Sequence, residues 1–394
     1  RVLGVHIADV SHYVRPGSAI DREARRRSNS VYFCDRVLPM LPEVLSNGVC
    51  SLVPGEDRLA FSVFMTFDRS GEMIKRSFAK SVIRSKVRFT YEEVMAVIRG
   101  GSPAAVGRRA AKAVRQVSEL AQQLRARRFA AGALDLEIPE VSLRLDAHGE
   151  MSAIELRPYD QSHQMIEECM VSANEAVAKE LWTRGVKIPA RLHEPPEEEK
   201  LLTLRSELRG LGVKMGDITK PKVFASFLKS IKSHPLYPTI AMLVLRSMKK
   251  AVYDSRSIGH FGLAKKYYAH FTSPIRRYPD LMLHRQLARQ LAGENARMSP
   301  AVLEKAAAHA TECEEIAAEA ERALIEIKKF RYMQSLAGSR TAIEFDAVIS
   351  KCMPFGCFVE IPELAVSGLV HVSALGGGYV RFNESDQTLS SAKR

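Results

Sequence analysis

The amino-acid sequence predicts an α+β fold with a strand-rich beginning, a helical centre and a small β-rich end. Three changes of periodicity along the 394 residues support this prediction. Residues 2–8 form an apolar run of β-type, and residues 59–67 mix alternation with β-branched and aromatic side chains. Residues 73–91 alternate basic with apolar side chains, which is typical of a strand with one wet face. From residue 162 to about residue 334, the apolar positions recur at helical spacing. After residue 338, short alternating segments return and predict a second, smaller unit.

The first part of the chain is predicted to contain a strand over 59–67, a turn over 68–71 and a basic strand from residue 73 toward 91. A helix over 104–130 follows, and we interpret its many arginines mainly as a solvated face. Gly132 ends that helix. Residues 133–140 are expected to be extended, and 141–155 to form a hairpin that turns at 146–149.

The helical centre and the β-rich end complete the predicted order of elements. Helices are expected over 162–184, 198–211, 222–233, 239–253, 274–292 and 299–334. The last is unusually long, and its composition suits a helix lying across the domain surface. Strands are expected over 341–349, 355–361 and 367–372, with glycines beside aromatic residues as in a small twisted barrel. The sequence ends before a five-stranded barrel could close.

Composition indicates a polyanionic partner. The chain has 58 lysines and arginines against 45 acidic residues, a formal net charge of +13 and a pI near 9.5. This balance fits nucleic acid or a membrane surface, and the plainer alternative is a merely basic soluble protein. No stretch approaches the roughly 18 apolar residues of a membrane span. The six cysteines form no C-x-x-C pair, so we expect free thiols in a reducing cytosol and no zinc site.

The beginning of the sequence suggests that the natural protein continues upstream. The chain opens at Arg1 and runs at once into an apolar strand, and no signal peptide precedes it. We therefore expect this sequence to be an N-terminally truncated form.

The segment Tyr268–Arg285 carries the strongest indication of an anion site. Thr272 or Ser273 is a suitable N-cap, and Pro274 suits the first position of a helix. Arg276 and Arg277 would then lie in the first turn, where the helix dipole disfavours a cation unless an anion is near. This pattern fits a phosphate site, and it fits equally an arginine paired with a carboxylate such as Asp280 or a nearby glutamate.

Polar residues inside three other apolar segments are further candidates. Glu167 and Asn174 share one helix face and could orient ribose hydroxyls, or could pair internally with arginines. Tyr32, Phe33 and Tyr91 could stack on bases, although isolated aromatic residues more often belong to the core. Asp9 interrupts a strand and is either a turn residue or part of a metal site, but one carboxylate alone cannot hold Mg²⁺.

Taken together, these stretches resemble the RNB catalytic domain shared by ribonuclease II and ribonuclease R. The matching motifs, in order, are HIADVSHYV, SVYF, LPMLPEVLSNGVCSL, IEECMVSAN, GHFGLA and YAHFTSPIRRYPDLMLHR. The tail, with FDAVIS, FGCFVEI and GLVHVSAL, resembles an OB barrel of the ribosomal S1 type. The resemblance implies an RNB domain over 1–337 and a partial S1-type domain over 338–394, an order that looks most like ribonuclease R.

The resemblance also implies an activity and a set of site residues. The family degrades single-stranded RNA processively from its 3′ end, using Mg²⁺, and releases nucleoside 5′-monophosphates. Tyr32 falls on the tyrosine that clamps terminal bases, and Tyr91 on a second active-site tyrosine. Glu168 or its neighbour Glu167 falls on the glutamate that contacts the terminal nucleotide, and Arg276 on the arginine that grips the scissile phosphate. Further expected RNA contacts are Phe33, Asn174, Ser273, Arg277, Tyr278, His284 and Arg285.

The sequence departs from the family pattern in two ways. The aspartate-rich motif that supplies the Mg²⁺ ligands lies upstream of HIADVS in the family, and this sequence begins after it. Leu136 replaces an aromatic residue expected to stack on a base, so stacking there should be weaker. We therefore expect the chain, a cytoplasmic monomer, to bind RNA but to cleave it poorly alone. A non-catalytic RNA-binding protein of the same fold is the alternative, whereas a membrane-surface protein fits poorly because no broad apolar face opposes the basic residues.

Overall fold

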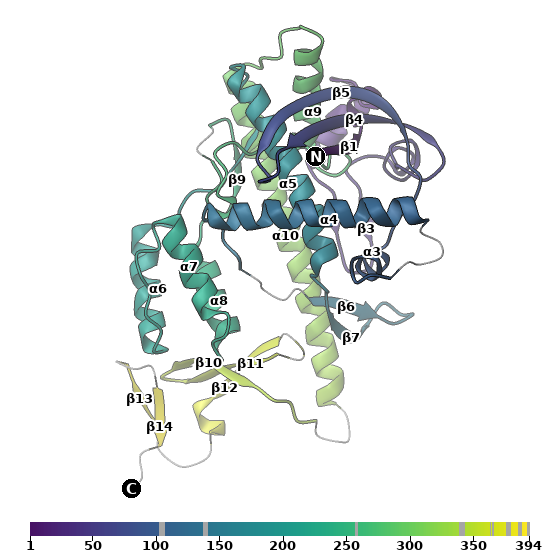
Figure 1. Ribbon diagram of the computed structural model, residues 1–394. Helices are drawn as coiled ribbons and strands as arrows, with labels where there is room; N and C mark the ends of the chain where they lie inside the picture. The colour runs from purple at the N-terminus through teal and green to yellow at the C-terminus, as the bar shows by residue number, and fades with distance from the viewer. Residues whose placement is uncertain are drawn as a thin grey trace.

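The computed structural model describes residues 1–101, 107–136, 141–256, 259–338, 343–362, 364, 366–375, 380–384 and 388–391. Strands dominate its beginning, helices its centre and strands its end, so the predicted α+β fold class is confirmed. Figure 1 shows a curved sheet at the top of the molecule, helices through its middle and the C-terminal strands at the bottom.

The curved sheet consists of β1 (Val2–Ala8), β4 (Asp57–Phe67) and β5 (Met73–Arg84), which pair antiparallel in the order β1-β4-β5. Val5 lies opposite Val63, and Val63 lies opposite Phe78. Alternate residues of β1 and β4 are buried and pack in one core with residues of α5 (Gln161–Thr183) and α9 (Tyr278–Leu291). The strand predicted to run from residue 73 toward 91 ends at Arg84, because α3 (Tyr91–Ile98) begins with a capping box at Thr90.

The excursion between β1 and β4 holds short elements. They are α1 (Val10–Tyr13), α2 (Ala19–Arg27), β2 (Val31–Tyr32), β3 (Val37–Leu38) and the helical turn η1 (Val44–Val49). The side chain of Ser18 caps α2, and β2 pairs with β3 as a two-stranded ribbon. This excursion packs against α9 and α10 (Pro300–Ala337).

Helix α4 (Arg108–Ala130) lies below the sheet in Figure 1 and packs against the long helix α5, which also contacts β1 and β4. The prediction of a helix over 162–184 is therefore confirmed. Gly132 has a φ of +104° and follows the end of α4, as expected for a left-handed glycine stop. The hairpin of β6 (Val141–Leu145) and β7 (Met151–Leu156) is confirmed as well, whereas 102–106 and 137–140 lie outside the described residues.

Three helices form a unit with its own core, namely α6 (Glu198–Gly210), α7 (Pro221–Ile231) and α8 (Tyr237–Ser247). The helix predicted over 239–253 is wrong at its end. Val252–Asp254 form the strand β9, which pairs with β8 (Ala190–Leu192) and lies against α10. The Tyr253 N–H donates to the Thr311 hydroxyl at 2.9 Å, so a distant helix takes a donor that a longer α8 would have used.

The helix predicted over 274–292 begins later than expected. Its first residue is Tyr278 and its N-cap is Arg277, so Pro274 is not the first helical residue. Residues 274–276 form a turn, which is closed by the Arg277 N–H donating to the Ser273 carbonyl at 3.0 Å. The Tyr278 N–H donates to the Ser28 carbonyl at 2.7 Å, so contacts with the α2 end fix this boundary.

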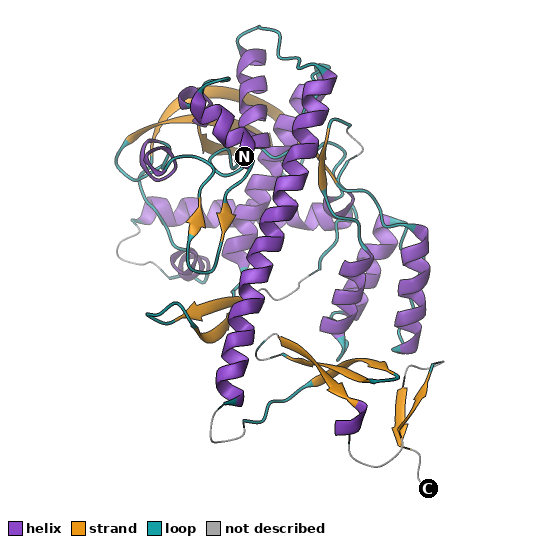
Figure 2. Ribbon diagram, turned by 180° about the vertical axis from the view of Figure 1, so that it is seen from behind, coloured by secondary structure: helices purple, strands orange, loops and turns teal. Residues whose placement is uncertain are grey.

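Helix α10 is the longest described helix and links the upper part of the molecule to its C-terminal strands (Figure 2). The strands β10 (Val348–Met353), β11 (Gly356–Ile361) and β12 (Val366–His371) form one sheet, and β13 (Val380–Asn383) and β14 (Thr388–Ser391) form a separate ribbon. The strand predicted over 341–349 is mostly absent from its described part, since 343–347 are irregular. Over the described residues the strands do not close a barrel, so the OB assignment and the domain boundaries stay predictions. No helix in the described ranges has the length and apolar composition that crossing a bilayer requires.

Candidate functional site

A buried carboxylate organises the turn that precedes α9. Asp280 is fully buried, and its Oδ1 accepts from the Ser273 N–H at 2.7 Å and from Arg277 Nη2 at 2.9 Å. Its Oδ2 accepts from Arg277 Nε at 2.8 Å. Burial alone would lower the pKa of Arg277, but the charge of Asp280 outweighs it and raises that pKa. The alternative of an arginine paired with Asp280 therefore holds for Arg277.

Arg276 lies beside Tyr32 on the surface. The guanidinium carbon is 5.9 Å from the centre of the Tyr32 ring, and Tyr32 is 45% exposed. In the described part of the chain, no carboxylate lies within 4.0 Å of the Arg276 guanidinium. The Ser30 N–H donates to the Arg276 carbonyl at 3.0 Å, and the Tyr32 N–H donates to Glu321 of α10 at 2.8 Å. An exposed cation and an exposed aromatic ring are thus held side by side by their backbones.

Phe33 follows Tyr32 at the end of the β2–β3 ribbon. It is partly buried, and its N–H donates to the Arg36 carbonyl at 2.9 Å. The ribbon therefore presents Tyr32 more openly than Phe33.

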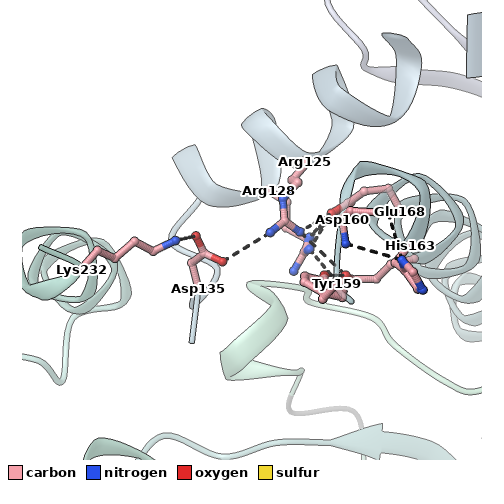
Figure 3. A network of polar contacts seen from close by, with 9 residues as sticks. Arg125, Arg128, Asp135, Tyr159, Asp160, His163, Glu168 and Lys232 are labelled. Atoms are coloured by element: carbon pink, nitrogen blue, oxygen red, sulfur yellow. Dashed lines mark hydrogen bonds and ion pairs between the residues drawn. The ribbon is translucent and has the colours of Figure 1, made fainter. Parts of the chain in front are cut away.

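Glu167 and Glu168 of α5 lie against two arginines of α4. Figure 3 shows Glu168 beside Arg125 and Arg128. Arg128 Nη2 is 2.5 Å from Glu168 Oε1 and 2.9 Å from Glu167 Oε1, and Arg125 Nη1 is 3.8 Å from an oxygen of each. The side chains of Arg128 and Glu168 are only 4% and 2% exposed, whereas Glu167 is 32% exposed. Burial would lower the pKa of Arg128, but its contacts with Glu168 and Glu167 raise it. The internal pairing predicted as an alternative thus occurs, but with arginines of α4.

The cluster extends on both sides of this pair (Figure 3). The Tyr159 hydroxyl donates to Glu167, and burial together with this carboxylate raises the pKa of Tyr159 to about 12. Asp135 accepts from Arg125 at 3.4 Å and from Lys232, the C-cap residue of α7, at 2.6 Å. Three helices are therefore connected by alternating charges.

Tyr91 stacks on His163, with ring centres 3.9 Å apart and planes inclined by 14°. His163 Nδ1 lies 3.0 Å from Asp160 at the N-cap of α5. Because His163 and Glu167 are four residues apart on this helix, they share one face. The structure thus brings Tyr91 to the face of α5 that carries Glu167, and 43% of Tyr91 remains exposed.

Asn174 connects α5 with the segment that leads to Arg276. Its Nδ2 donates to the Tyr268 hydroxyl at 3.1 Å, and its Oδ1 accepts from the Phe271 N–H at 2.8 Å. Asn174 is buried, and both the nitrogen and the oxygen of its side-chain amide are hydrogen-bonded inside the protein. Burial raises the pKa of Tyr268, while the Asn174 hydrogen bond and the charges of Arg277 and Arg128 oppose the rise. The charges of Arg277, beside Asp280, and of Arg128, beside Glu168, therefore both act on Tyr268.

Three further predicted RNA contacts lie inside the protein. His284 is fully buried, stacks on Phe271 at 4.1 Å between ring centres, and contacts the Phe271 carbonyl through Nε2 at 2.7 Å. Burial lowers the pKa of His284 to about 4, so it is neutral at pH 7. Tyr278 and Arg285 both donate to Asp21 of α2, at 2.9 and 2.7 Å. The structure does not bring these three residues to the open surface beside Tyr32.

Asp9 is buried and has polar partners of its own. Its Oδ1 accepts from the Ser11 hydroxyl, and its Oδ2 lies 3.1 Å from Lys80 Nζ. Within the described ranges, no three His, Cys, Asp or Glu side chains are grouped as a metal ion would require. With a lysine already at its carboxylate, Asp9 does not fit as a magnesium ligand in this arrangement.

Sequence reasoning missed Arg125, Arg128 and Tyr159. Composition indicates a solvated face for the arginines, although Arg128 follows the buried Ala121 by seven residues and so shares its face of α4. That spacing was the available signal. A single sequence does not show that Glu167 and Glu168 of α5 lie against this face of α4.

Comparison with known proteins identifies the family. The RNB domain family matches residues 1–293. Ribonuclease R of Thermotoga maritima is 42% identical over 388 residues, covering 96% of this chain and 54% of that protein. Ribonuclease R of Escherichia coli is 38% identical over 405 residues, covering 98% of this chain and 49% of that protein. The chain thus spans about half the length of the curated relatives it matches.

Solved structures agree with this assignment. The apo form of Mycoplasma genitalium RNase R superposes with a TM-score of 0.91 at 30% identity, covering all of this chain and 62% of that one. The same enzyme in complex with ribose-methylated single-stranded RNA gives 0.90, also at 30% identity, with the same coverage of both chains. Yeast Ssd1, a pseudonuclease, shares the fold with a TM-score of 0.80 at 22% identity, covering 98% of this chain and 48% of that one. This chain therefore belongs to the RNB-domain family, the family of ribonuclease R.

Proposed function

We propose that this chain is most of the catalytic domain of a 3′-to-5′ hydrolytic exoribonuclease, and that the whole protein shortens single-stranded RNA processively and releases nucleoside 5′-monophosphates. Membership of the ribonuclease R family supports the reaction class. The observation that carries the proposal is the exposed pair of Arg276 and Tyr32, because phosphate and base are the two groups that every nucleotide presents.

Arg276 is the residue we assign to the scissile phosphate. A guanidinium group donates several hydrogen bonds in one plane and fits two phosphate oxygens at once. Arg277 is less suited to this role, because its Nε and Nη2 are directed to the buried carboxylate of Asp280. Tyr32 stacks on a base next to that phosphate and keeps the strand in register.

The sequence left two glutamates, Glu167 and Glu168, as candidates for contacting the terminal nucleotide. Glu167 is the better candidate. Glu168 is 2% exposed and forms a buried ion pair with Arg128, so its carboxylate stabilises the charge of that arginine. Glu167 is 32% exposed, and its oxygens keep lone pairs beyond those used by Arg128 and Tyr159. Those lone pairs can accept hydrogen bonds from ribose hydroxyls. Tyr91, on the same face, offers a ring to the last base.

We propose Mg²⁺ as the cofactor of the whole protein, on the strength of the family resemblance. The roles of Arg276, Tyr32, Glu167 and Tyr91 are proposed from the contacts and exposure of these side chains. Among the described residues, no group of three His, Cys, Asp or Glu side chains could hold the ion. Single-stranded RNA as the substrate, a monomeric state and a cytoplasmic location are part of the same proposal.

The proposal is tested with a 5′-labelled single-stranded RNA and matched forms of the protein. Arg276→Ala removes the proposed phosphate contact, and Arg69→Ala, which replaces an exposed arginine in the turn between β4 and β5, is the matched control. In EDTA, we expect Arg276→Ala to weaken RNA retention about tenfold and Arg69→Ala to leave it unchanged. With Mg²⁺, we expect the full-length protein to give a ladder shortened one nucleotide at a time, and the 394-residue chain to give little cleavage.

Internal cuts, or equal retention by Arg276→Ala and the parent chain, would refute the proposal. Retention of RNA without cleavage by the full-length protein would favour the non-catalytic RNA-binding alternative.

A further inference from the structure

Two adjoining hollows lie between α2, α9 and α10, on a face that the proposed reaction does not use. The deeper one is a cavity of about 260 Å³. It is small beside the roughly 300–1,000 Å³ of pockets for drug-sized ligands, so it suits a group of about one ring system. Its surface is mostly apolar and includes Pro16, Tyr278, Met282, Met298, Val302 and Ala306, while Asp21 and Arg289 are among the charged residues that also line it.

Two residues that line this cavity, Gln286 and Arg285, each carry a buried hydrogen-bonding atom that has no partner in the described part of the molecule. Gln286 is 3% exposed, and its Oε1 accepts nothing, while its Nε2 donates to the Lys187 carbonyl at 2.7 Å. That bond fixes the amide orientation, because a carbonyl can only accept. Arg285 directs Nη2 to Asp21 and to the Val14 carbonyl, and Nη1 to the Tyr278 hydroxyl, which leaves its Nε–H without an acceptor among the described residues. An unused acceptor and an unused donor thus belong to adjacent residues of the cavity wall.

The second hollow is a basic cleft of about 520 Å³, and Arg25 lines both hollows. Four cations, Arg22, Arg25, Arg26 and Lys305, face one carboxylate, Glu312, and one histidine, His309. Arg26 is bound to Glu23, and Arg22 donates to the Gly17 carbonyl. Arg25 and Lys305 are exposed and have no carboxylate within 4.0 Å in the ranges described. The cleft therefore has positive charge to offer an anion.

We propose that these hollows form an accessory nucleotide-binding site, which we call the α2–α10 site and which takes one nucleotide of an RNA strand or a free nucleotide. The base enters the apolar cavity, where its edge supplies a donor to Gln286 and an acceptor to Arg285. Every nucleobase carries both kinds of group on its edge. The phosphate lies in the basic cleft beside Arg25 and Lys305.

The α2–α10 site is separate from the Tyr32–Arg276 pair but lies along the same helix. His309 and Glu321, which holds the Tyr32 backbone, are 12 residues apart on α10, or about 18 Å at the rise of an α-helix. A few nucleotides of extended strand cover such a distance. The site is thus placed to hold RNA at a second point, and its occupancy does not require the proposed cleavage reaction.

The test is isothermal titration calorimetry of the chain in EDTA with uridine 5′-monophosphate, uridine and ribose 5-phosphate. Removing either the phosphate or the base should weaken binding at least about tenfold. Val302→Trp fills the mouth of the cavity at a side chain that is 45% exposed, so it should abolish this binding without disturbing the core. Arg25→Ala should weaken binding of uridine 5′-monophosphate about tenfold and leave binding of uridine unchanged, whereas Arg69→Ala should change the binding of neither. A uridine tetranucleotide, titrated in parallel, tells whether a strand is preferred to the free nucleotide.

The outcomes separate this inference from the proposed function. Nucleotide binding that survives Val302→Trp but is lost in Arg276→Ala would place all binding at the proposed catalytic site and overturn the α2–α10 site. Equal binding of ribose 5-phosphate and the nucleotide would overturn it as well, because the cavity would then hold no base. Binding that is lost in Val302→Trp and kept in Arg276→Ala would establish it.

Discussion

Replacing Arg128 tests whether the charge cluster between α4 and α5 is needed for the fold. We expect Arg128→Met to fill much of the same space while leaving the Glu168 carboxylate, 2% exposed, without its closest cation. Removing one member of a buried ion pair costs about 3–5 kcal/mol, because the remaining charge stays desolvated and unpaired. Arg125 remains 3.8 Å from the same carboxylate and offsets part of that cost. The expected loss of unfolding free energy is therefore at the lower end, about 3 kcal/mol.

The neighbouring arginine provides the control. Arg127 is 46% exposed and lies 3.6 Å from Glu72, which is 66% exposed. Exposed pairs contribute about 0–1 kcal/mol, so Arg127→Met should change the unfolding free energy by less than about 1 kcal/mol. The double variant Arg128→Met/Glu168→Met removes both buried charges and should recover most of the loss.

The measurement is urea unfolding followed by the fluorescence of Trp182. It is the single tryptophan of the chain and lies on α5, the helix that carries Glu168. The signal therefore reports the unit in which the substitution is made, even if the C-terminal strands unfold separately. A loss for Arg128→Met no larger than that for Arg127→Met would refute the reasoning, because the pair would then be no better buried than a surface pair.

Two predictions concern the packing around α9. Burial lowers the pKa of His284 to about 4, against an ordinary value near 6.5, so between these values the unfolded chain binds a proton that the folded chain does not. The contribution of His284 to the unfolding free energy is present above about pH 6.5 and decreases as the pH falls, by about 2 kcal/mol from about pH 7 to about pH 5. His284→Gln should remove this part of the pH dependence, as measured by urea titrations at the two pH values. Asn174→Ala leaves the buried Phe271 N–H without an acceptor, and should cost about 1–3 kcal/mol of unfolding free energy and weaken RNA retention. An unchanged pH dependence, or full RNA retention, would contradict the respective prediction.

Elements with strong local patterns could be predicted from the sequence. The amphipathic run that forms α5, the long helix α10 and the β6–β7 hairpin follow from periodicity and turn residues within each segment. Boundaries set by distant partners could not be predicted in this way. The end of α8 depends on Tyr253 bonding to Thr311, which is 58 residues away in the sequence.

The same division applies to the candidate site. Arg276, Tyr32 and Tyr91 were predicted by their resemblance to family motifs, and the structure places Arg276 beside Tyr32. The grouping of Glu167 with Arg128 and Tyr159 could not be predicted, because it depends on how α4 crosses α5. Helical spacing indicates which face a residue is on, but it does not indicate what that face meets.

The carboxylate of Asp280 determines which of two adjacent arginines is available to a ligand. The sequence pattern predicts both arginines in the first turn of a helix, with a phosphate site at the free N–H groups there. That geometry is wrong, since the helix begins at Tyr278 and the N–H of Tyr278 is used by the Ser28 carbonyl. Arg277 is bound by Asp280 through two nitrogens, and its neighbour Arg276 is left at the surface with only its backbone fixed. The Arg276 guanidinium is therefore available to a ligand because the buried carboxylate of Asp280 pairs with the neighbouring Arg277. The positive end of the helix dipole is not required for this.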